Sequence, residues 1–395
     1  MVKFVDINFG IFLSRLNELD PRDPRENLAI DPTHHARIWQ AMRLPLTCIF
    51  SLFIPAALLA QETAETTIGH GAARYRVDMK WAKADPAVAP VINSHALAES
   101  KDGHIFLVTD HPKNDFIVFE KDGRYVRSIS AGLGGGHGLE IFESGGTEYL
   151  LHIDCGWHFA AEGWNPTAGQ GRVTLLTTAG EVVRKFPTPD ELGVTPGKFM
   201  PCDAAVSPSG TLLIADGYAT NLVYEFTLEG KLVKKWGGAT KDAAHLSNAH
   251  GISIDTGDPR GPLVWVPSRD ECQVKAFTLE GKHVDTIDLP GAFAGQLVFR
   301  GDRIYTAVCW SKENGTGPRL KQSGFVLVLD RQTKRVISAP GGSEPVYVEG
   351  KLQPMHQTHP IFKHGHDLYV DSVGDIYVGE WNADRRYPTK LTLVK

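Results

Sequence analysis

The chain has 395 residues, 42% hydrophobic and 22% charged, with a formal net charge of −5 at pH 7. This composition is typical of a folded globular protein with a large core. Because the charge is small and not gathered into runs of like sign, it argues against a nucleic-acid partner and against a basic membrane-binding face. Composition leaves a small-molecule or peptide substrate open, and it leaves the oligomeric state undetermined.

The N-terminal region consists of two unlike segments. Residues 1–41 are charged, contain prolines and show no sustained apolar period, so we expect a non-native upstream extension or a disordered segment. Met42 and Arg43 are followed by the uncharged run LPLTCIFSLFIPAALLA, which ends at Ala60. This pattern predicts a cleaved signal peptide at residues 42–60, with Met42 as the true start. A membrane anchor is the alternative.

If the signal is cleaved, the mature chain starts at Gln61. We then expect a secreted or periplasmic protein that has no membrane contact after cleavage. Residues 61–71 are expected to be a linker to the folded domain at residues 72–395.

Similar units recur along residues 72–395. Clear copies begin at Leu97, Ala204 and Ile252, and weaker copies begin near Gly138, Leu297 and Asp367. Each unit alternates apolar and polar residues around tight turns such as DG, SG or EG, which indicates short antiparallel strands. Units without an insertion are spaced by about 42 to 47 residues, in the range of four-stranded propeller blades.

We therefore predict an all-β fold, a six-bladed β-propeller of four-stranded blades over residues 72–395. The last unit shows only three strands, whereas ARYRVDMKW at residues 73–81 has no partner. Placing this N-terminal strand in the last blade would close the ring and remove two exposed edges. Long insertions, such as GWHFAAEGWNPTAGQG, are expected on one face, where they often carry function.

Three histidines occupy equivalent positions on the first strands of alternate units: His137, His250 and His366. The first strand of a blade lines the central channel, so these imidazoles are expected to meet at one level. Three neutral nitrogen ligands with an open fourth position describe a catalytic zinc site. Alternatively, each is a hydrogen-bonded histidine that fills a polar channel. His95, which begins the first unit, could contact substrate, could support a metal ligand without binding the metal itself, or could only line the channel.

At this point the sequence resembles a known family, the peptidyl-α-hydroxyglycine α-amidating lyase domain within the NHL-repeat six-bladed propellers. The matching motifs are HGLEI, PCDAAVSPSGTLLIADGYATNLVYEFTLEGKLVKKWG, AHGISID, VPSRDECQVKAF and GHDLYVDSVGDIYVGEWNAD. Together they cover most of residues 95–390. The most specific motif lies in residues 201–237, because generic NHL repeats do not require its DGY after the second strand.

The resemblance implies two metal ions. A catalytic zinc would be held by His137, His250 and His366. A structural calcium would be held by the side chain of Asp367 and the backbone carbonyl of Leu139, which are oxygen ligands suited to a hard cation.

The resemblance also implies the reaction, the cleavage of an N-acyl-α-hydroxyglycine to an amide and glyoxylate. Zinc would polarise the substrate hydroxyl, Tyr218 would act as the base and Arg269 would bind the carboxylate. Structural alternatives exist for each residue: an amphipathic loop residue for Tyr218, an ion pair with Asp270 for Arg269, and a turn cap for Asp367.

Two features depart from the family pattern. The family has a further arginine after the second strand of the first blade, where this chain has Asp110 and His111, and His111 is a candidate substrate contact. The disulfide positions of the family are not reproduced either. In an exported chain, the candidate bridges are Cys155 to Cys202 and Cys272 to Cys309.

Two other functions stay open on the sequence alone. One is a calcium-dependent hydrolase of the lactonase type, although such propellers generally centre their metal on carboxylates and an asparagine. The other is a non-catalytic NHL propeller that binds a partner on its insertion-bearing face, because propellers host unrelated functions.

Overall fold

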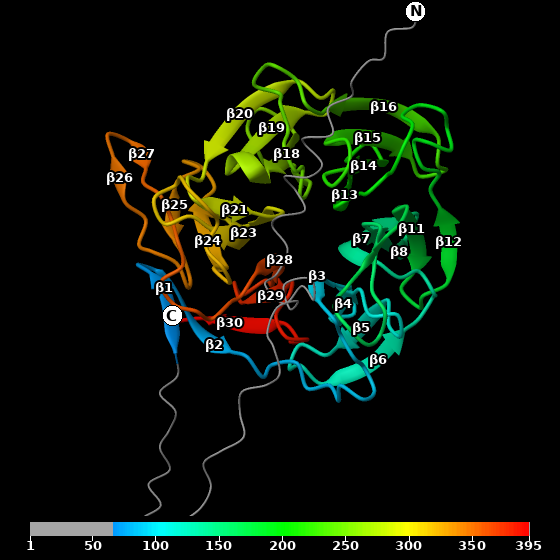
Figure 1. Ribbon diagram of the computed structural model, residues 1–395, viewed down its shortest axis with the longest axis horizontal. Coiled ribbons are helices and arrows are strands. Elements are labelled where there is room, and N and C mark those ends of the chain that lie inside the picture. The colour runs from blue at the N-terminus through cyan, green and yellow to red at the C-terminus, as the bar shows by residue number, and fades with distance from the viewer. Residues whose placement is uncertain (1–65, 395) are drawn as a thin grey trace, which may run out of the picture. The chain divides into compact units, whose positions relative to one another are not determined.

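The computed structural model describes residues 66–394. They form an all-β propeller, in which successive sheets are arranged around a common centre in chain order (Figure 1). The single helical segment of this range is a 3₁₀ turn, η2 (Arg269–Glu271), and no helix in it could cross a membrane. Residues 1–41 and the signal peptide predicted at 42–60 lie outside the described residues, so both assignments stay predictions.

Three sheets have four strands each, and every strand is antiparallel to its neighbours. One contains β7 (Gly136–Ser144), β8 (Thr147–Asp154), β11 (Arg172–Thr177) and β12 (Val182–Lys185). The next contains β13 (Asp203–Val206), β14 (Thr211–Ala215), β15 (Leu222–Thr227) and β16 (Leu232–Gly237). The third contains β17 (Ser253–Asp255), β18 (Leu263–Ser268), β19 (Gln273–Thr278) and β20 (His283–Asp288).

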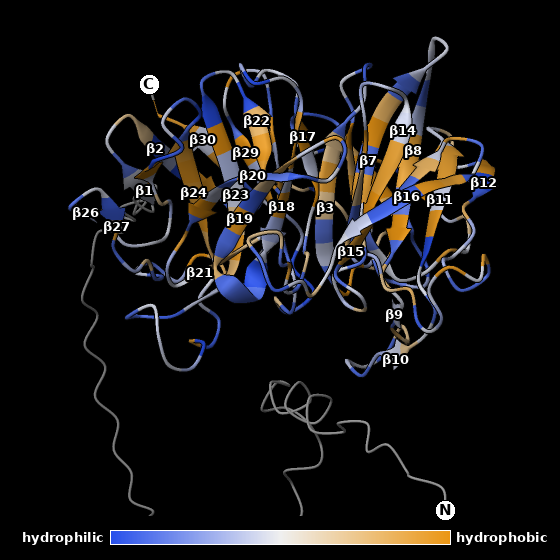
Figure 2. Ribbon diagram, turned by 90° about the horizontal axis from the view of Figure 1, so that it is seen from above, coloured by the Kyte–Doolittle hydropathy of each residue, from blue (hydrophilic) through white to orange (hydrophobic). Residues whose placement is uncertain are grey.

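A five-stranded sheet follows, with β21 (Ala292–Ala294), β22 (Val298–Arg300), β23 (Arg303–Ser311), β24 (Phe325–Asp330) and β25 (Val336–Ser338). Two short hairpins lie in loops, β9 (Trp157–His158) with β10 (Thr167–Ala168), and β26 (Tyr347–Val348) with β27 (Lys351–Leu352). The first hairpin belongs to an insertion noted in the sequence, and it projects from one face of the sheets (Figure 2).

The remaining strands form a nine-stranded sheet from both ends of the described chain. One part contains β3 (Ser94–Glu99), β4 (Ile105–Thr109), β5 (Phe116–Phe119) and β6 (Tyr125–Ile129). The other contains β28 (Gly365–Val370), β29 (Ile376–Glu380), β30 (Thr389–Leu393), β2 (Ala73–Asp78) and β1 (Thr67–His70). The hydrogen bonding thus differs from six separate four-stranded sheets, because the ends of β29 and β3 meet and pair Glu380 with Ser94.

The N-terminal strand lies beside the C-terminal strand. β2 pairs antiparallel with β30, with Val77 opposite Leu391, which is the pairing expected for the strand at residues 73–81. β1 adds a further strand outside β2. It lies in the stretch expected to be a linker, so that expectation is wrong for residues 67–70; the edge of β2 gains a hairpin partner there.

The middle strands of each sheet are buried on both faces. All residues of β4 and β5 are buried, whereas all residues of the outer strand β12 are exposed. Stacked sheets bury both faces of a strand, which explains apolar runs such as FVLVLD in β24. Five hydrophobic clusters lie between successive sheets, and a sixth lies between the two parts of the nine-stranded sheet. Figure 2 shows middle strands such as β14 as mainly apolar.

The predicted disulfides are not present. Cys155, Cys202, Cys272 and Cys309 are all buried free thiols. Burial raises the pKa of each thiol, that of Cys309 to about 11, which keeps the sulfur protonated and unreactive. The expectation that these cysteines form bridges is therefore wrong for this structure; the four residues pack as small apolar side chains.

Candidate metal centre

Four histidines lie beside equivalent strand pairs in three sheets, because the nine-stranded sheet contributes two of them. Ser94 pairs with Thr109, Gly136 with Asp154, Ala249 with Ser268 and Gly365 with Glu380, and a histidine follows the first residue of each pair. These are His95, His137, His250 and His366, each at most 5% exposed. Beside His95, His137 and His366 the strand register shifts, and such bulges re-aim side chains at functional sites.

Polar atoms converge on one ring nitrogen of His137. Its Nε2 lies 3.0 Å from Nε2 of His366 and 3.0 Å from the hydroxyl of Tyr218. The same hydroxyl lies 2.7 Å from Nε2 of His250. The Tyr218 hydroxyl therefore contacts two of the three predicted zinc ligands, His137 and His250. The other predicted ligand, His366, contacts His137.

The hydrogen bond on the other side of the His137 ring fixes its tautomer. Nδ1 lies 2.7 Å from the carbonyl of Cys202, which can only accept, so Nδ1 carries the proton and Nε2 the lone pair. Burial lowers the pKa of His137, His250 and His366 well below the ordinary range. Neighbouring positive groups act in the same direction. Neutral imidazoles with a lone pair in the channel are the form that a metal ion requires.

The residues fit a bound metal ion. A cavity of about 10 Å³ lies among His137, His250 and His366, which is close to the size of one water molecule. Nitrogen atoms of His95, His137 and His366 all lie within 4.8 Å of one another, so these three buried histidines could hold a metal. This group shares two members with the predicted zinc ligands and contains His95 in place of His250.

Buried carboxylates lie beside the histidines, and Asp203 and Asp367 line the same small cavity. Asp203 has one oxygen without a protein partner, and its other oxygen accepts from the backbone N–H of Ile252 at 3.0 Å. Burial raises the pKa of Asp367 to about 7 and that of Glu140 to about 8, and the charge of Asp367 adds to the second effect. The pKa of Asp203 is also well above its usual range, first because of burial and then because of Asp367.

Two of these carboxylates, Glu140 and Asp203, lie near the residues predicted to bind calcium. Asp367 was expected as a ligand, together with the backbone carbonyl of Leu139, whose side chain packs in the core. One oxygen of Asp367 accepts from the N–H of Leu368 at 2.7 Å, a local bond that also fits the turn-cap alternative. Glu140 and Asp203, which directly follow Leu139 and Cys202, were not among the predicted ligands. The charge of Asp367 disfavours ionisation of Glu140 and Asp203, a cation would offset that effect, and carboxylate oxygens suit a hard one.

Arg269 is 2% exposed, and its guanidinium lacks a full set of partners. Nε donates to the carbonyl of Ala294 at 3.2 Å, while Nη2 is buried without a protein partner. The alternative of an ion pair with Asp270 is wrong, because Asp270 accepts from Arg319 at 2.8 Å. A buried cation with an unused N–H is suited to an anionic ligand.

Tyr218 is only partly buried, but burial raises the pKa of its hydroxyl well above the ordinary value. Arg269 acts in the opposite direction and favours the phenolate. The hydroxyl contacts two of the channel histidines, so it faces the predicted metal site, and the alternative of an amphipathic loop residue stays open.

The two further candidate contacts differ. His95 lies 3.1 Å from Asp110, and both side chains are buried. His111 is also buried, and its Nδ1 accepts from the backbone N–H of Lys113 at 3.1 Å. Burial lowers the pKa of His111, and the charge of Arg385 adds to this effect. His95 therefore lies in the centre, whereas His111 belongs to the loop after β4.

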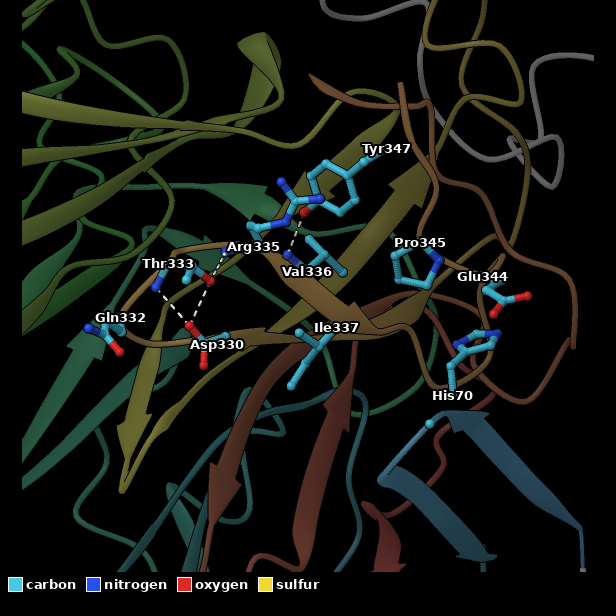
Figure 3. Close-up of a pocket in the computed structure, with 11 residues that line it drawn as sticks. His70, Asp330, Gln332, Thr333, Arg335, Val336, Ile337, Glu344, Pro345 and Tyr347 are labelled. Carbon is cyan, nitrogen blue, oxygen red and sulfur yellow. Dashed lines mark hydrogen bonds between the residues drawn. The ribbon is translucent and has the colours of Figure 1, made fainter. Parts of the chain in front are cut away.

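A separate cavity of about 460 Å³ contains none of the predicted site residues. It lies at the outer edges of β1 and β25, where Figure 3 shows Arg335 stacked on Tyr347. The guanidinium carbon lies 3.6 Å from the ring centroid, and the hydroxyl of Tyr347 accepts from the N–H of Val336 at 2.7 Å. Arg335 and Tyr347 already contact one another and the neighbouring backbone. This cavity therefore has no group of converging polar side chains like the one around His137.

Comparison with known proteins agrees with the motif resemblance. Over 206 residues, the chain is 22% identical to peptidylglycine alpha-amidating monooxygenase of Rattus norvegicus. The chain resembles an amidating-lyase propeller. The match covers 49% of this chain and only 18% of the rat protein, and no family model matches the sequence.

Solved structures were compared as well. Virginiamycin B lyase from Staphylococcus aureus is 14% identical, with a TM-score of 0.44, and the match covers 77% of this chain and 96% of that one. A luciferin-regenerating enzyme is 9% identical, with a TM-score of 0.47, and the match covers 77% of this chain and 92% of that one. Structural similarity at these identities and TM-scores says nothing about the activity of this chain.

Proposed function

We propose that the chain is an exported, metal-dependent carbon–nitrogen lyase of the amidating type. Its substrate would be an N-acyl-α-hydroxyglycine, and its products a primary amide and glyoxylate. The observation that most supports this proposal is the hydroxyl of Tyr218, held between His137 and His250 beside the incompletely paired guanidinium of Arg269. A base and an anion-binding group are the two protein functions that this elimination requires.

The proposed elimination conserves every atom of the substrate. Tyr218, as the phenolate, takes the proton of the substrate hydroxyl, and the electrons of that O–H bond form the new carbonyl. The carbon–nitrogen bond breaks, its electron pair stays on the amide nitrogen, and the proton passes from Tyr218 to that nitrogen. Arg269 holds the carboxylate throughout, which keeps the hydroxyl oriented toward the base.

A metal ion fits this chemistry and these residues. His137 and His366 would be two ligands, and His250 or His95 would supply a third nitrogen, a donor set typical of catalytic zinc. When bound, such a cation polarises the hydroxyl and stabilises negative charge on oxygen. This matters for Tyr218, because burial alone holds its hydroxyl protonated at neutral pH.

A calcium ion fits the neighbouring carboxylates. Asp367, Asp203 and Glu140 would be its side-chain ligands, with the carbonyl of Leu139 as a backbone ligand. Its charge would allow the three neighbouring acids to ionise together, so its role would be to stabilise the channel rather than to react.

We further infer that the propeller has six blades. The nine-stranded sheet divides at the single pair Glu380↔Ser94 into two sets of strands, which count as the first and last blades. Five hydrophobic clusters between successive sheets, and a sixth between these two sets of strands, support this count.

A second candidate is the calcium-dependent hydrolase, which the buried carboxylates favour. The two functions are separated by metal content and product. The purified full chain should contain about one zinc ion by elemental analysis, and should release glyoxylate from N-benzoyl-α-hydroxyglycine. A zinc-loaded protein that releases no glyoxylate would rule out the lyase, and lactone hydrolysis that needs calcium alone would establish the hydrolase.

A further inference from the structure

Aromatic side chains gather on the face of the propeller at which the second strand of each blade ends. Five of them form one group of contacting rings, here called the aromatic cluster: Phe159, Trp164, Trp310, His364 and Trp381. We propose that the aromatic cluster binds an aromatic acyl group, so that the favoured substrate is an α-hydroxyglycine whose N-acyl group carries an aromatic ring. This inference rests on the proposed function and narrows its substrate class.

The first argument is the place of Trp381, which matches that of Arg269. Arg269 directly follows β18, whose last residue pairs with the residue before His250. Trp381 directly follows β29, whose last residue pairs with the residue before His366. Equivalent positions in the blades of a propeller form a ring around the channel. Trp381 therefore lies on the same rim as the proposed carboxylate-binding group.

The second argument is the geometry of the rings. Trp381 is central, and its ring centroid lies 5.7 Å from that of Trp164, 5.6 Å from that of Trp310 and 5.2 Å from that of His364. Phe159 extends the cluster, 5.5 Å from Trp164. The phenyl ring and the three indole rings are all half-buried, so part of each stays open to a ligand. Tilted aromatic rings at these spacings suit contact with a further ring.

The third argument is that the cluster is held in place without a ligand. The N–H of Trp381 donates to the carbonyl of His364 at 3.0 Å, and Nδ1 of His364 donates to the carbonyl of Trp381 at 3.2 Å. The insertion that carries β9 and β10 is tied to the same blade, because Arg385 donates to the carbonyl of Ala161 at 3.0 Å. A site whose parts are already fixed loses little conformational entropy when a ligand binds.

The proposed reaction explains why an acyl group would occupy this site. Arg269 would bind the carboxylate of the substrate and Tyr218 its hydroxyl, so the acyl group is the part without a partner. The cavity among the channel histidines is about 10 Å³, which is too small for an acyl group. The acyl group must therefore extend toward the rim, where the aromatic cluster lies. Binding sites for small molecules are typically lined by such apolar and aromatic side chains.

Probe binding tests the aromatic cluster without turnover. N-benzoylglycine and N-acetylglycine have the carboxylate and amide of the proposed substrate but lack the reacting hydroxyl. Calorimetry on the purified full chain should show roughly 10- to 100-fold tighter binding of the benzoyl probe, the usual effect of burying one aromatic ring. Trp381→Leu should reduce this ratio at least about fivefold and change the affinity for N-acetylglycine less than about threefold.

Two further variants make the result interpretable. Trp164→Leu changes the loop between β9 and β10, outside the blades, and should also reduce the ratio. Trp236→Leu is the matched control, because Trp236 is a half-buried tryptophan on the outer strand β16, 4.8 Å from Phe277 in ring centroids, and it should keep the wild-type ratio. Equal affinity for the two probes, binding of neither probe, or a ratio that Trp381→Leu and Trp164→Leu leave unchanged would overturn the inference.

Steady-state kinetics separates this inference from the lyase proposal. The wild-type chain should release glyoxylate from N-benzoyl-α-hydroxyglycine with a kcat/KM at least about tenfold above that for N-acetyl-α-hydroxyglycine. Glyoxylate release without this preference would overturn the aromatic site and leave the lyase standing. Benzoyl-selective binding that depends on Trp381, without glyoxylate release from either compound, would support the aromatic site and reject the lyase.

Discussion

Arg269 offers an unusual test, because its replacement should affect stability and activity in opposite directions. Its guanidinium is 2% exposed; Nε donates to the carbonyl of Ala294, whereas Nη2 is buried without a protein partner. A buried charge without full compensation destabilises the free protein. Arg269→Met keeps most of the volume and removes both the charge and the unpaired N–H.

The expected magnitudes follow from these contacts. A buried unsatisfied donor costs about 1 to 3 kcal/mol, so removing it should raise the free energy of unfolding. We expect a gain of up to about 2 kcal/mol, because Asp367 at the same time loses the stabilising charge of Arg269. A bidentate carboxylate contact contains two charge-assisted hydrogen bonds of about 1.5 to 3 kcal/mol each. Losing at least about 3 kcal/mol corresponds to a fall in kcat/KM of roughly 100-fold.

Urea unfolding of the metal-free protein and initial rates of glyoxylate release measure the two effects. Arg319→Met is the matched control, because Arg319 pairs with Asp270 and stacks 4.4 Å from the Phe293 ring centroid. We expect this control to change kcat/KM less than tenfold. The reasoning is refuted if Arg269→Met lowers the free energy of unfolding by more than about 2 kcal/mol, or if it retains wild-type kcat/KM.

Other predictions follow from the same structure. Tyr218→Phe should keep zinc affinity and lower kcat by at least about 100-fold, the usual contribution of a general base; turnover close to wild type would exclude Tyr218 from that role. His152, buried with neither ring nitrogen bonded, has its pKa lowered by burial to about 4 from 6.5. The unfolded chain therefore binds the extra proton first, and the free energy of unfolding should fall by about 3 kcal/mol as the pH drops from 6.5 to 4. His152→Leu should remove this part of the pH dependence in urea titrations, and an unchanged dependence would show that His152 is not its source. Calcium affinity, measured by calorimetry, should increase as the pH rises through 7 to 8, because Asp367 and Glu140 must lose their protons; Asp367→Asn should weaken binding, and a pH-independent affinity would contradict the proposed ligands. Mass spectrometry of denatured protein alkylated without reductant should show four labelled cysteines at positions 155, 202, 272 and 309, whereas two unlabelled pairs would restore the predicted bridges.

Much of the local organisation could be predicted from the sequence. Alternating apolar residues and glycine turns repeat in each unit, and these signals are local, so they indicate strands and hairpins without knowledge of the partners. The equivalent places of His137, His250 and His366 could also be found, because each lies at a fixed distance from its own turn. The free cysteines were not predicted, since an even number of cysteines does not reveal whether two thiols lie in bonding geometry.

The partners of each site residue depend on contacts between distant parts of the chain. His137 and His366 are 229 residues apart, and their contact exists because separate sheets meet at one channel. Strand register and bulges decide that His95 faces these histidines and that Asp110 fixes its ring. The repeat therefore determined which positions line the channel, whereas only the tertiary structure decided which side chains touch there. Hydrogen bonds and metal sites require atoms within a few ångströms, and strand periodicity alone does not define those distances.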